Sequence, residues 1–402
     1  MNYKGEVEKM RSMSLMQRAK VSKAGTLAIS VAIASLVVST LVVATGGAPA
    51  GASSSSAAGL KYAESVVAKY SQPPSSWKPA GGPINVASLK GESIWVVVIG
   101  ESIPVVQEGD AGLQAAATLA GINLHICDAQ LTPSGAAACI SQAIDSHPNA
   151  IITNAIPISY DQPGFSAIES AGIPLVYANS PALAAKGTDK VAFVPDSTNF
   201  AGTLEADWTI ADSGGKAHAL VMEDTDAPIT TQILTKGFAP QFKQHCPDCT
   251  LKVVGVETTQ FANLPPLTST ALAENPNVDY VVPTLDAMTQ LTLQGVTTAG
   301  AVSRVKGVTG SGPAWQMIQA KNFIVADVES SQYLIAWLEF DQALRMLLHA
   351  PVVQNEDQPW RIFTAKNVDG VTLRSGDDDL YMYGLPTAET IFGRLWHVKT
   401  AS

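Results

Sequence analysis

Short apolar runs alternate with helical patterns along most of this chain. The runs lie between residues 94 and 326, are rich in β-branched residues, and are apolar at consecutive positions rather than at every second one. Such runs are typical of strands covered on both faces, as in parallel sheets built from β-α-β units. The pattern therefore predicts an α/β fold. The predicted strands are 94–99, 123–127, 150–153, 174–177, 219–222, 251–256, 280–282, 304–308 and 323–326, and the predicted helices are 112–120, 135–146, 165–171, 201–211, 230–245, 286–299 and 332–349.

Length and charge limit the classes of protein to which this chain can belong. The chain has 402 residues, of which 46% are hydrophobic and 15% charged, and its net charge is −10. The roughly 310 residues after Glu92 suit two domains better than one. Lys and Arg are scattered beyond the N-terminus and no helix-turn-helix precedes Glu92, which disfavours a nucleic-acid partner and a DNA-binding regulator.

The first 52 residues have the pattern of a targeting segment. Six Lys and Arg side chains precede an apolar stretch at 24–44, and small residues follow at 48–52. This arrangement predicts export to the periplasm or cell envelope. The apolar stretch is longer than the ~7–15 residues of a cleaved signal, so an uncleaved membrane anchor remains the alternative. A lipid-acylated N-terminus is excluded because no cysteine precedes Cys127.

Residues 53–91 differ in composition from both neighbours. They are rich in Ser, Pro and Gly and have a weak hydrophobic pattern. The composition predicts a linker with one helix at 60–70. We expect Tyr70 and Trp77 to cover the surface of the following domain.

Four cysteines in an exported chain suggest two disulfides. Cys246 and Cys249 close a predicted helix before a strand, whereas a thioredoxin-type redox motif opens a helix after one. We therefore expect a structural staple there. Cys127 ends a strand and Cys139 lies in the next helix, so they can pair if their Cα atoms lie within ~7 Å. The alternative for that second pair is two buried free thiols.

Catalytic and metal-binding signatures are missing from the sequence. No nucleophile elbow, P-loop, HExxH or dinucleotide-binding glycine motif occurs, and the six histidines have no metal-ligand spacing. The acidic run 377–379 lacks the alternating ligands of a calcium loop. A hydrolase would need a nucleophile and base pair that the sequence does not show. We therefore predict a protein that is not an enzyme and has no cofactor or metal.

Polar side chains gather after the predicted strands. In a parallel α/β sheet, ligands bind at the carboxyl ends of the strands. The loops there carry carboxylates, amides and hydroxyls with a few aromatic rings, which suits a small polar molecule.

Several of these segments carry a family resemblance. They are VVVIGESIPVV at 96–106, AGIPLV at 171–176, 195–209, Gly237-Phe238, VDYVVPTLDAM at 278–288, and 325–332. From about 92 to 370 the chain resembles the type I periplasmic binding proteins of sugar importers, in the ribose-binding branch. The resemblance implies two αβα lobes with parallel sheets, joined by three crossings near 195–199, 326–331 and 361–364. It places residues 92–195 plus 330–360 in the first lobe and 196–329 plus 361–402 in the second. The tail is expected to pack on the second lobe through Tyr381, Tyr383, Phe392 and Trp396.

The resemblance also implies a ligand site, placed to within one or two positions. Apolar residues replace the family's sugar-stacking rings after the first strand, and an amide replaces its sugar-clamping Arg, whereas one aromatic residue of the second lobe is kept. The implied site residues are Ile103, Val105, Val106, Asn179 and Ser180 in the first lobe, and Gln232, Phe261, Asp286, Thr309 and Glu329 in the second lobe or at the hinge.

The missing Arg and rings leave two interpretations of the ligand. Other residues replace them, with Glu101, Asp224, Asp226, Trp315 and Tyr160 as candidates, or the ligand is not an ordinary aldose. An acidic group at Glu223, Asp224 and Asp226 would accept a cationic ligand, or these residues cap the helix that starts near Thr230.

By this resemblance the chain is an extracytoplasmic, monomeric solute-binding protein of an ABC importer. It would bind a small polar ligand, a sugar or sugar-like molecule, between its lobes and deliver it to a membrane permease. The alternative is a sensory ligand-binding module for a non-sugar molecule, anchored by residues 24–44.

Overall fold

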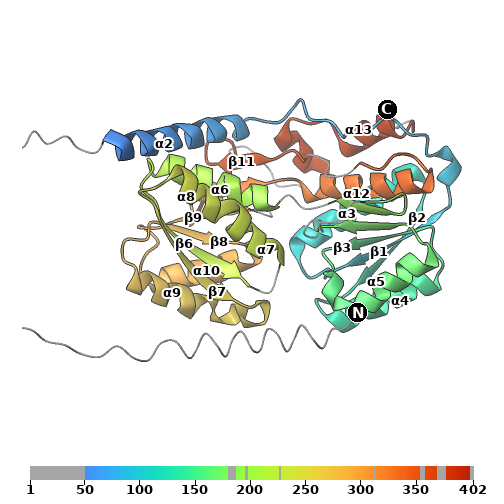
Figure 1. Cartoon of the computed structure of the whole chain (residues 1–402), viewed down its shortest axis with the longest axis horizontal. Helices are drawn as coiled ribbons and strands as arrows, with labels where there is room; N and C mark the ends of the chain where they lie inside the picture. Colours follow the sequence, from blue (N-terminus) through green and yellow to red (C-terminus); the bar gives the residue numbers. More distant parts are fainter. Residues whose placement is uncertain are drawn as a thin grey trace, which may run out of the picture. The chain divides into compact units, whose positions relative to one another are not determined.

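Two sheets organise the chain. The computed structural model describes residues 50–179, 187–194, 198–225, 228–310, 314–353, 358–368 and 377–398, and side chains at 50–55, 198, 228, 286 and 377–379 lie outside that description. Within these ranges eleven strands form a five-stranded and a six-stranded sheet (Figure 1). Of the predicted targeting segment 1–52, residues 1–49, including the apolar stretch 24–44, lie outside the described residues, and residues 50–52 begin a helix.

The first lobe is built on the five-stranded sheet, which is parallel throughout. Side chains alternate between its faces: Val96 packs towards α3 and α12, whereas Val97 packs towards α4 and α5. The strand order is β2-β1-β3-β4-β5. The elements are β1 (Ser93–Val98), α3 (Pro104–Ala120), β2 (Asn123–Asp128), α4 (Pro133–Asp145), β3 (Ala150–Asn154), α5 (Gln162–Ala171), β4 (Leu175–Ala178), β5 (Val191–Val194) and α12 (Gln332–Leu347).

The second lobe repeats this topology. Its order β7-β6-β8-β9-β10 matches that of the first sheet, and β11 adds an antiparallel edge beside β10. The elements are α6 (Thr198–Asp212), β6 (His218–Asp224), α7 (Pro228–Gln232), the π-helix η3 (Ile233–Phe238), α8 (Ala239–His245), β7 (Thr250–Val256), the 3₁₀ turn η4 (Thr258–Asn263), α9 (Leu264–Glu274), β8 (Tyr280–Pro283), α10 (Asp286–Thr298), β9 (Lys306–Thr309), α11 (Trp315–Gln319), β10 (Ile324–Glu329) and β11 (Arg361–Thr364).

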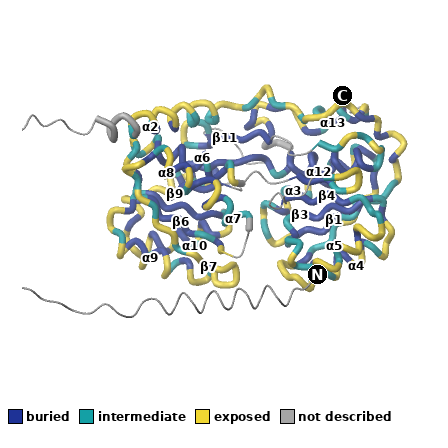
Figure 2. Tube along the Cα trace, viewed as in Figure 1, coloured by how far each residue is buried: buried dark blue, intermediate teal, exposed yellow. Residues whose placement is uncertain are grey.

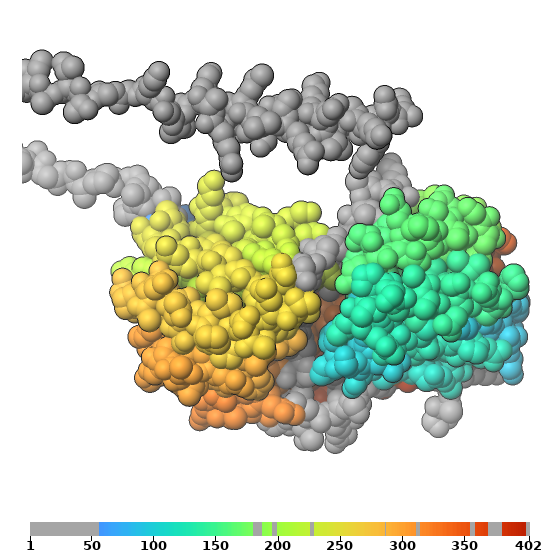
Figure 3. All heavy atoms as spheres, turned by 90° about the horizontal axis from the view of Figure 1, so that it is seen from below, coloured from blue at the N-terminus to red at the C-terminus, as the bar shows by residue number. Residues whose placement is uncertain are grey.

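The cores lie between each sheet and its helices. Figure 2 shows most strands as buried, with β2 and β7, an edge strand of each sheet, more exposed. On the face drawn in Figure 3, each lobe is a closely packed body, coloured cyan to green for the first and yellow to orange for the second. The continuous apolar strands that the sequence predicted follow from this two-sided burial.

The predicted α/β class and all nine predicted strands are confirmed, each displaced by at most three residues at an end. Two strands of four residues each were not predicted, β5 and β11. The helix α3 begins at Pro104 rather than at residue 112, because a proline is favoured in the first turn of a helix. The helix α9 was not predicted, and it too has prolines in its first turn.

An N-terminal helix packs on the second lobe. The helix α2 (Ala50–Tyr70) contacts α6 and α8, and Ala63 is fully buried there. The ring of Tyr62 stacks on that of His245 with centroids 4.1 Å apart. The predicted helix at 60–70 is confirmed as the C-terminal part of α2, which begins earlier, at Ala50, whereas the predicted linker boundaries stay a prediction.

The tail crosses to the first lobe. Tyr383, which ends the 3₁₀ turn η5 (Asp377–Tyr383), packs on Phe363 of β11, as expected for a tail on the second lobe. The helix α13 (Ala388–Leu395) instead contacts α3 and α12, and the rings of Phe392 and Trp396 stack on Trp337. The prediction that the whole tail packs on the second lobe is wrong for α13, and Tyr381 is exposed.

The N-terminal arm, residues 71–92 between α2 and β1, also contacts the first lobe. Ile84 and Val86 are buried in the core that α3 and α12 share, and the backbone N–H of Ile84 donates to the carbonyl of Leu395. Of the three predicted crossings, 195–197 lies outside the described residues, and Ser330 and Ser331 connect β10 to α12. The third position is occupied by β11 itself. The predicted domain boundaries stay predictions.

Both predicted disulfides are present. Cys127 of β2 joins Cys139 of α4 with Cα atoms 5.7 Å apart, inside the expected limit. Cys246 and Cys249 close the turn between α8 and β7, and the Sγ of Cys249 accepts a hydrogen bond from the backbone of Ala217. The structural-staple interpretation of that pair agrees with its place at the end of a helix.

Candidate ligand-binding site

A buried polar network lies at the carboxyl edge of the first sheet. Asn154 ends β3, and Asn179 follows β4 directly. Asn154 shares its face of the sheet with Ile152, so it points towards α12. There Glu339, which is fully buried, accepts from Nδ2 of Asn154 at 2.9 and 3.0 Å and from Nδ2 of Asn179 at 3.1 Å.

Two further contacts complete this network. Nδ2 of Asn179 lies 3.3 Å from Oδ1 of Asn154 and 3.4 Å from Oε1 of Gln332, the first residue of α12. The network therefore ties β3, β4 and α12 together where ligands bind in parallel α/β sheets. The helix α12 is the element that follows β10 of the second lobe, so the network also stands next to a connection between the lobes.

The backbone is strained at the same edge. Gln130 and Leu131 after β2, Ala155 after β3 and Asn179 after β4 have φ values of 53°, 59°, 57° and 45°. Left-handed backbone at residues other than glycine costs energy, and such residues cluster at functional sites. Among the described residues, the carboxyl edge of the second sheet has no such position.

Carboxylates gather after β1 and β2. Asp128 ends β2, and its Oδ1 accepts from the backbone N–H groups of Gln130 at 2.7 Å and Glu101 at 3.3 Å. Burial, and then the charges of Glu101 and Asp128, raise the pKa of Asp110 on α3 to about 7. This part of the edge is therefore electronegative, and Glu101 lies in it as an exposed side chain.

Asp224 lies at the equivalent position in the second lobe, the carboxyl edge of its sheet. It ends β6, is 1% exposed, and its carboxylate accepts from Oγ1 of Thr258 at 3.2 and 3.3 Å. Its backbone N–H donates to Oγ1 of Thr284, which follows β8. Burial raises the pKa of the neighbouring Glu223, opposed by a hydrogen bond from Thr231. Asp224 thus holds the loops after β6, β7 and β8 together.

Four other predicted site residues lie in or against the hydrophobic core. Val106 is buried in the first-lobe core, and Ile103 and Val105 pack against it at the start of α3. Trp315 is 4% exposed and faces Phe363 with ring centroids 4.7 Å apart. These four side chains support the fold, since apolar groups at the start of a helix turn inward.

The remaining predicted residues lie at or near the strand ends of the second sheet, apart from Tyr160. Gln232 is half-buried and its Oε1 accepts from Nζ of Lys236. The buried Thr309 and Glu329 end β9 and β10, and Phe261 is half-buried in η4. Tyr160 packs against the α4 and α5 core of the first lobe. Ser180, Asp226 and the side chain of Asp286 lie outside the described residues.

Sequence reasoning did not identify Asn154, Gln332 or Glu339. Asn154 stands directly after a predicted strand, which is a usable signal. Glu339 is a charged residue in the otherwise apolar stretch YLIAWLEF, and an acid in such a helix predicts a buried polar partner. Its partners are 160 and 185 residues away in sequence, so the pattern could not name them.

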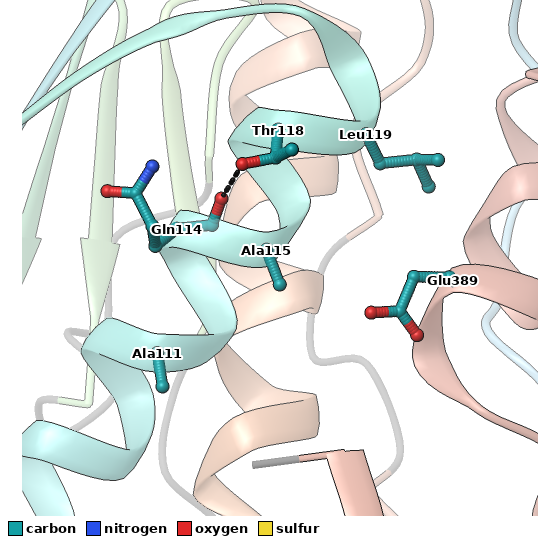
Figure 4. Close-up of a pocket in the computed structure, with 6 residues that line it drawn as sticks. All are labelled: Ala111, Gln114, Ala115, Thr118, Leu119 and Glu389. Atoms are coloured by element: carbon teal, nitrogen blue, oxygen red, sulfur yellow. Dashed lines mark hydrogen bonds between the residues drawn. The ribbon is translucent and has the colours of Figure 1, made fainter.

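A separate hollow of about 500 Å³ lies between α3 and α13. Figure 4 shows the carboxylate of Glu389 on α13 turned towards the α3 face that carries Ala111, Ala115 and Leu119. It is shallow and mostly apolar, and it contains none of the predicted site residues. The carboxyl edges of the sheets, and not this hollow, therefore remain the candidate site.

Within the described ranges, no helix is long and apolar enough to cross a membrane. The same residues contain no group of three or more His, Cys, Asp or Glu side chains arranged to hold a metal ion.

The chain belongs to the periplasmic binding protein domain family, whose model matches residues 94–346. This is a family of binding proteins, so the predictions of the family, the two-lobed α/β fold and a non-enzymatic role are confirmed. Comparison with curated proteins gives no match.

Solved structures with the same fold share little sequence with this chain. A sugar ABC transporter subunit of Rhodobacter sphaeroides is 19% identical with a TM-score of 0.61, covering 69% of this chain and 99% of that one. A glucose-galactose binding protein of Geobacillus stearothermophilus is 17% identical with a TM-score of 0.62, covering 70% and 99%. A 5-methylthioribose transporter solute-binding protein of Thermotoga lettingae is 16% identical with a TM-score of 0.62, covering 75% and 98%.

Proposed function

We propose that this protein is the extracytoplasmic solute-binding component of an ABC importer and that it binds a sugar or a sugar-like molecule. The observation that carries the proposal is the buried amide and carboxylate network at the carboxyl edge of β3 and β4. It stands at the ligand position of an αβα fold in a chain of the periplasmic binding protein family. The similar solved structures of sugar-binding and sugar-transport proteins support the ligand class.

Ligand binding would use both lobes. The first offers Asn179 beside the electronegative loops after β1 and β2, and the second offers the loops that Asp224 holds together. A ligand that contacts both edges stabilises the state in which they approach one another, and that state would dock on the permease. Hydroxyl groups of a sugar would donate to these acceptors, whereas an amine-bearing ligand would also be favoured by the carboxylates.

A thermal-shift screen of the purified protein tests the proposal. The panel is monosaccharides, polyols, sugar acids, amino acids, polyamines and nucleosides. A ligand present at 100 times its Kd adds about 2.7 kcal/mol to the stability and shifts Tm by several degrees. We expect a specific hit among sugars or polyols. A hit only among amino acids, polyamines or nucleosides would contradict the sugar assignment.

The site is tested with a matched pair of variants. Asn179→Ala removes an amide at the carboxyl edge, whereas Asn149→Ala removes one at the amino end of β3, where Oδ1 accepts from the backbone of Ser93. We expect only Asn179→Ala to weaken binding of the hit by tenfold or more. Equal affinity in both variants would exclude the proposed edge.

A second candidate is an anchored sensory module. The helix α2 packs on the second lobe immediately after the N-terminal segment, so residues 56–70 are not a long flexible spacer. Sequencing the N-terminus of the mature protein decides between the two. Cleavage near Gly51 supports the importer component, and an intact N-terminus supports the anchored module.

A further inference from the structure

In the network at Asn179, each hydrogen-bonding group can be assigned as a donor or an acceptor. Both carboxyl oxygens of Glu339 accept hydrogen bonds from amide groups, so Glu339 is the acceptor of the network. The amide nitrogens of Asn154 and Asn179 therefore both turn towards it. This orientation follows from the chemistry of the partner, because an amide turned the other way would place its oxygen against the carboxylate.

The orientation leaves one acceptor without a partner. All hydrogen bonds of the Asn179 side chain are made by Nδ2, and its Oδ1 is buried with no partner in the described structure. A buried acceptor without a hydrogen bond costs about 1–3 kcal/mol. The same residue has left-handed backbone, which Asn adopts more readily than most other residues. The unpartnered acceptor is therefore the feature that calls for a functional explanation.

We infer that Glu339 is a positioning residue of the ligand site, which fixes the amides of Asn154 and Asn179 so that Oδ1 of Asn179 is presented as an acceptor to a hydroxyl or ammonium group of the ligand. The inference rests on the proposed function and specifies its ligand chemistry. Glu339 itself lies behind the two amides, is fully buried and does not touch the ligand.

In this arrangement the acidic group and the group presented to the ligand belong to different residues. Asn179 carries an uncharged amide at the ligand edge, and the acidic group of the network lies one layer deeper, on Glu339. A second carboxylate at residue 179 would lie about 3 Å from the first, where like charges disfavour each other's ionised form. The neutral amide avoids that conflict and still supplies an oxygen to the ligand.

Replacing Glu339 by Gln changes which groups of the network donate hydrogen bonds and which accept them. The new side-chain NH₂ group needs an acceptor, so at least one Asn amide must turn its oxygen inward. If Asn179 turns, it presents NH₂ to the ligand instead of oxygen. Glu339→Asp keeps the acceptor chemistry on a shorter side chain and serves as the conservative rescue.

The first measurement needs no ligand. Side-chain amide signals of the full-length protein are recorded by ¹H–¹⁵N NMR, and those of the two residues are assigned by their loss in Asn154→Ser and Asn179→Ser. We expect Glu339→Gln to shift both pairs of signals and Glu339→Asp to keep them near the wild-type positions. Unmoved signals in Glu339→Gln would overturn the inference, whatever the ligand.

Asp341→Asn is the matched control. It lies on the same helix, is equally buried, and accepts from Arg345, Trp396 and Gln342 instead of Asn154 and Asn179. The same carboxylate-to-amide change there should leave the amide signals of Asn154 and Asn179 in place. Movement of those signals in Asp341→Asn as well would show a general effect on α12 and would count against a specific role of Glu339.

The second measurement is calorimetric binding of D-ribose, D-galactose and D-allose. For any of these sugars that binds the wild type, we expect Glu339→Gln to lose tenfold or more in affinity and Glu339→Asp and Asp341→Asn to stay within about threefold. Wild-type affinity in Glu339→Gln would overturn the inference. If neither these three sugars nor any sugar or polyol of the thermal-shift panel binds the wild type, the proposed ligand class fails, and the amide signals alone decide the role of Glu339.

Discussion

The indole Nε1 of Trp396 donates to Oδ1 of Asp341 at 2.7 Å, across 55 residues of sequence. The other oxygen of Asp341 accepts from Nε of Arg345 at 2.6 Å, and the guanidinium of Arg345 donates to the carbonyl of Gly82. One buried ion pair of α12 thus holds both the tail and the N-terminal arm. Gly82 and Trp396 lie outside residues 94–346, the part of the chain that matches the family model.

Trp396→Phe should destabilise the protein by about 1–3 kcal/mol, because the buried carboxylate of Asp341 loses a donor while the aromatic packing is mostly kept. Chemical denaturation measures the change. Trp337→Phe is the matched control, since Trp337 is buried in the same cluster and its Nε1 has no partner in the described structure. Equal losses in the two variants would show that the hydrogen bond contributes nothing beyond ring volume.

Asp110→Asn should stabilise the protein at high pH. Burial and the charges of Glu101 and Asp128 raise the pKa of Asp110 from 3.8 to about 7, so the folded state binds this proton more tightly than the unfolded state. Stability from Asp110 is therefore lost as pH rises from about 4 to 7. Denaturation midpoints at pH 4, 6 and 8 should show a gain for the variant that grows with pH and is complete above 7.

The control for this pH dependence is Glu64→Gln, an exposed position on α2. It removes one negative charge of the chain without touching the group at Glu101, Asp110 and Asp128. A similar gain in both variants would assign the effect to net charge rather than to the local environment of Asp110.

Removal of the two disulfides should have unequal effects. The Cys127–Cys139 bridge closes a loop with a sequence separation of 12, and Cys246–Cys249 one of 3. Loop-closure entropy predicts losses of about 3 and about 1.5 kcal/mol for the paired Cys→Ala variants. Denaturant titration compares them with the oxidised wild type. A larger loss at 246–249 would show that local packing of that turn outweighs chain entropy.

Much of the fold could be predicted because a strand that is buried on both faces has a continuous apolar run in the sequence. The strand β11 was missed because it begins with Arg361, whose charge hides the apolar pattern. Strand length does not explain why β5 was missed, since β4, β8 and β9 also have four residues and were predicted. The start of α2 was missed because residues 50–59 are all Ala, Gly or Ser and give no hydrophobic pattern.

Less of the candidate site could be predicted. Asn179 and Asp224 were found because each stands at the end of a strand, a position that the sequence reveals. Sequence does not show which loop side chains turn inward, and Trp315 therefore proved to be a core residue. Glu339 could not be paired with its two amides, because the pairing depends on how α12 packs across β3 and β4.

Two glycine substitutions should change stability in opposite directions and so test whether α2 is docked. A Cβ at Gly59 of α2 would lie 2.0 Å from the carbonyl oxygen of His245, whereas a Cβ at Gly109 of α3 would meet nothing within 4 Å. Gly109→Ala should stabilise by up to about 1 kcal/mol through helix propensity. Gly59→Ala should instead cost about 1–3 kcal/mol, since α2 must move away from α8. Denaturant titration gives both values, and limited proteolysis of α2 should be faster in Gly59→Ala alone. A stabilising Gly59→Ala with unchanged proteolysis would show that α2 does not pack on the second lobe in solution.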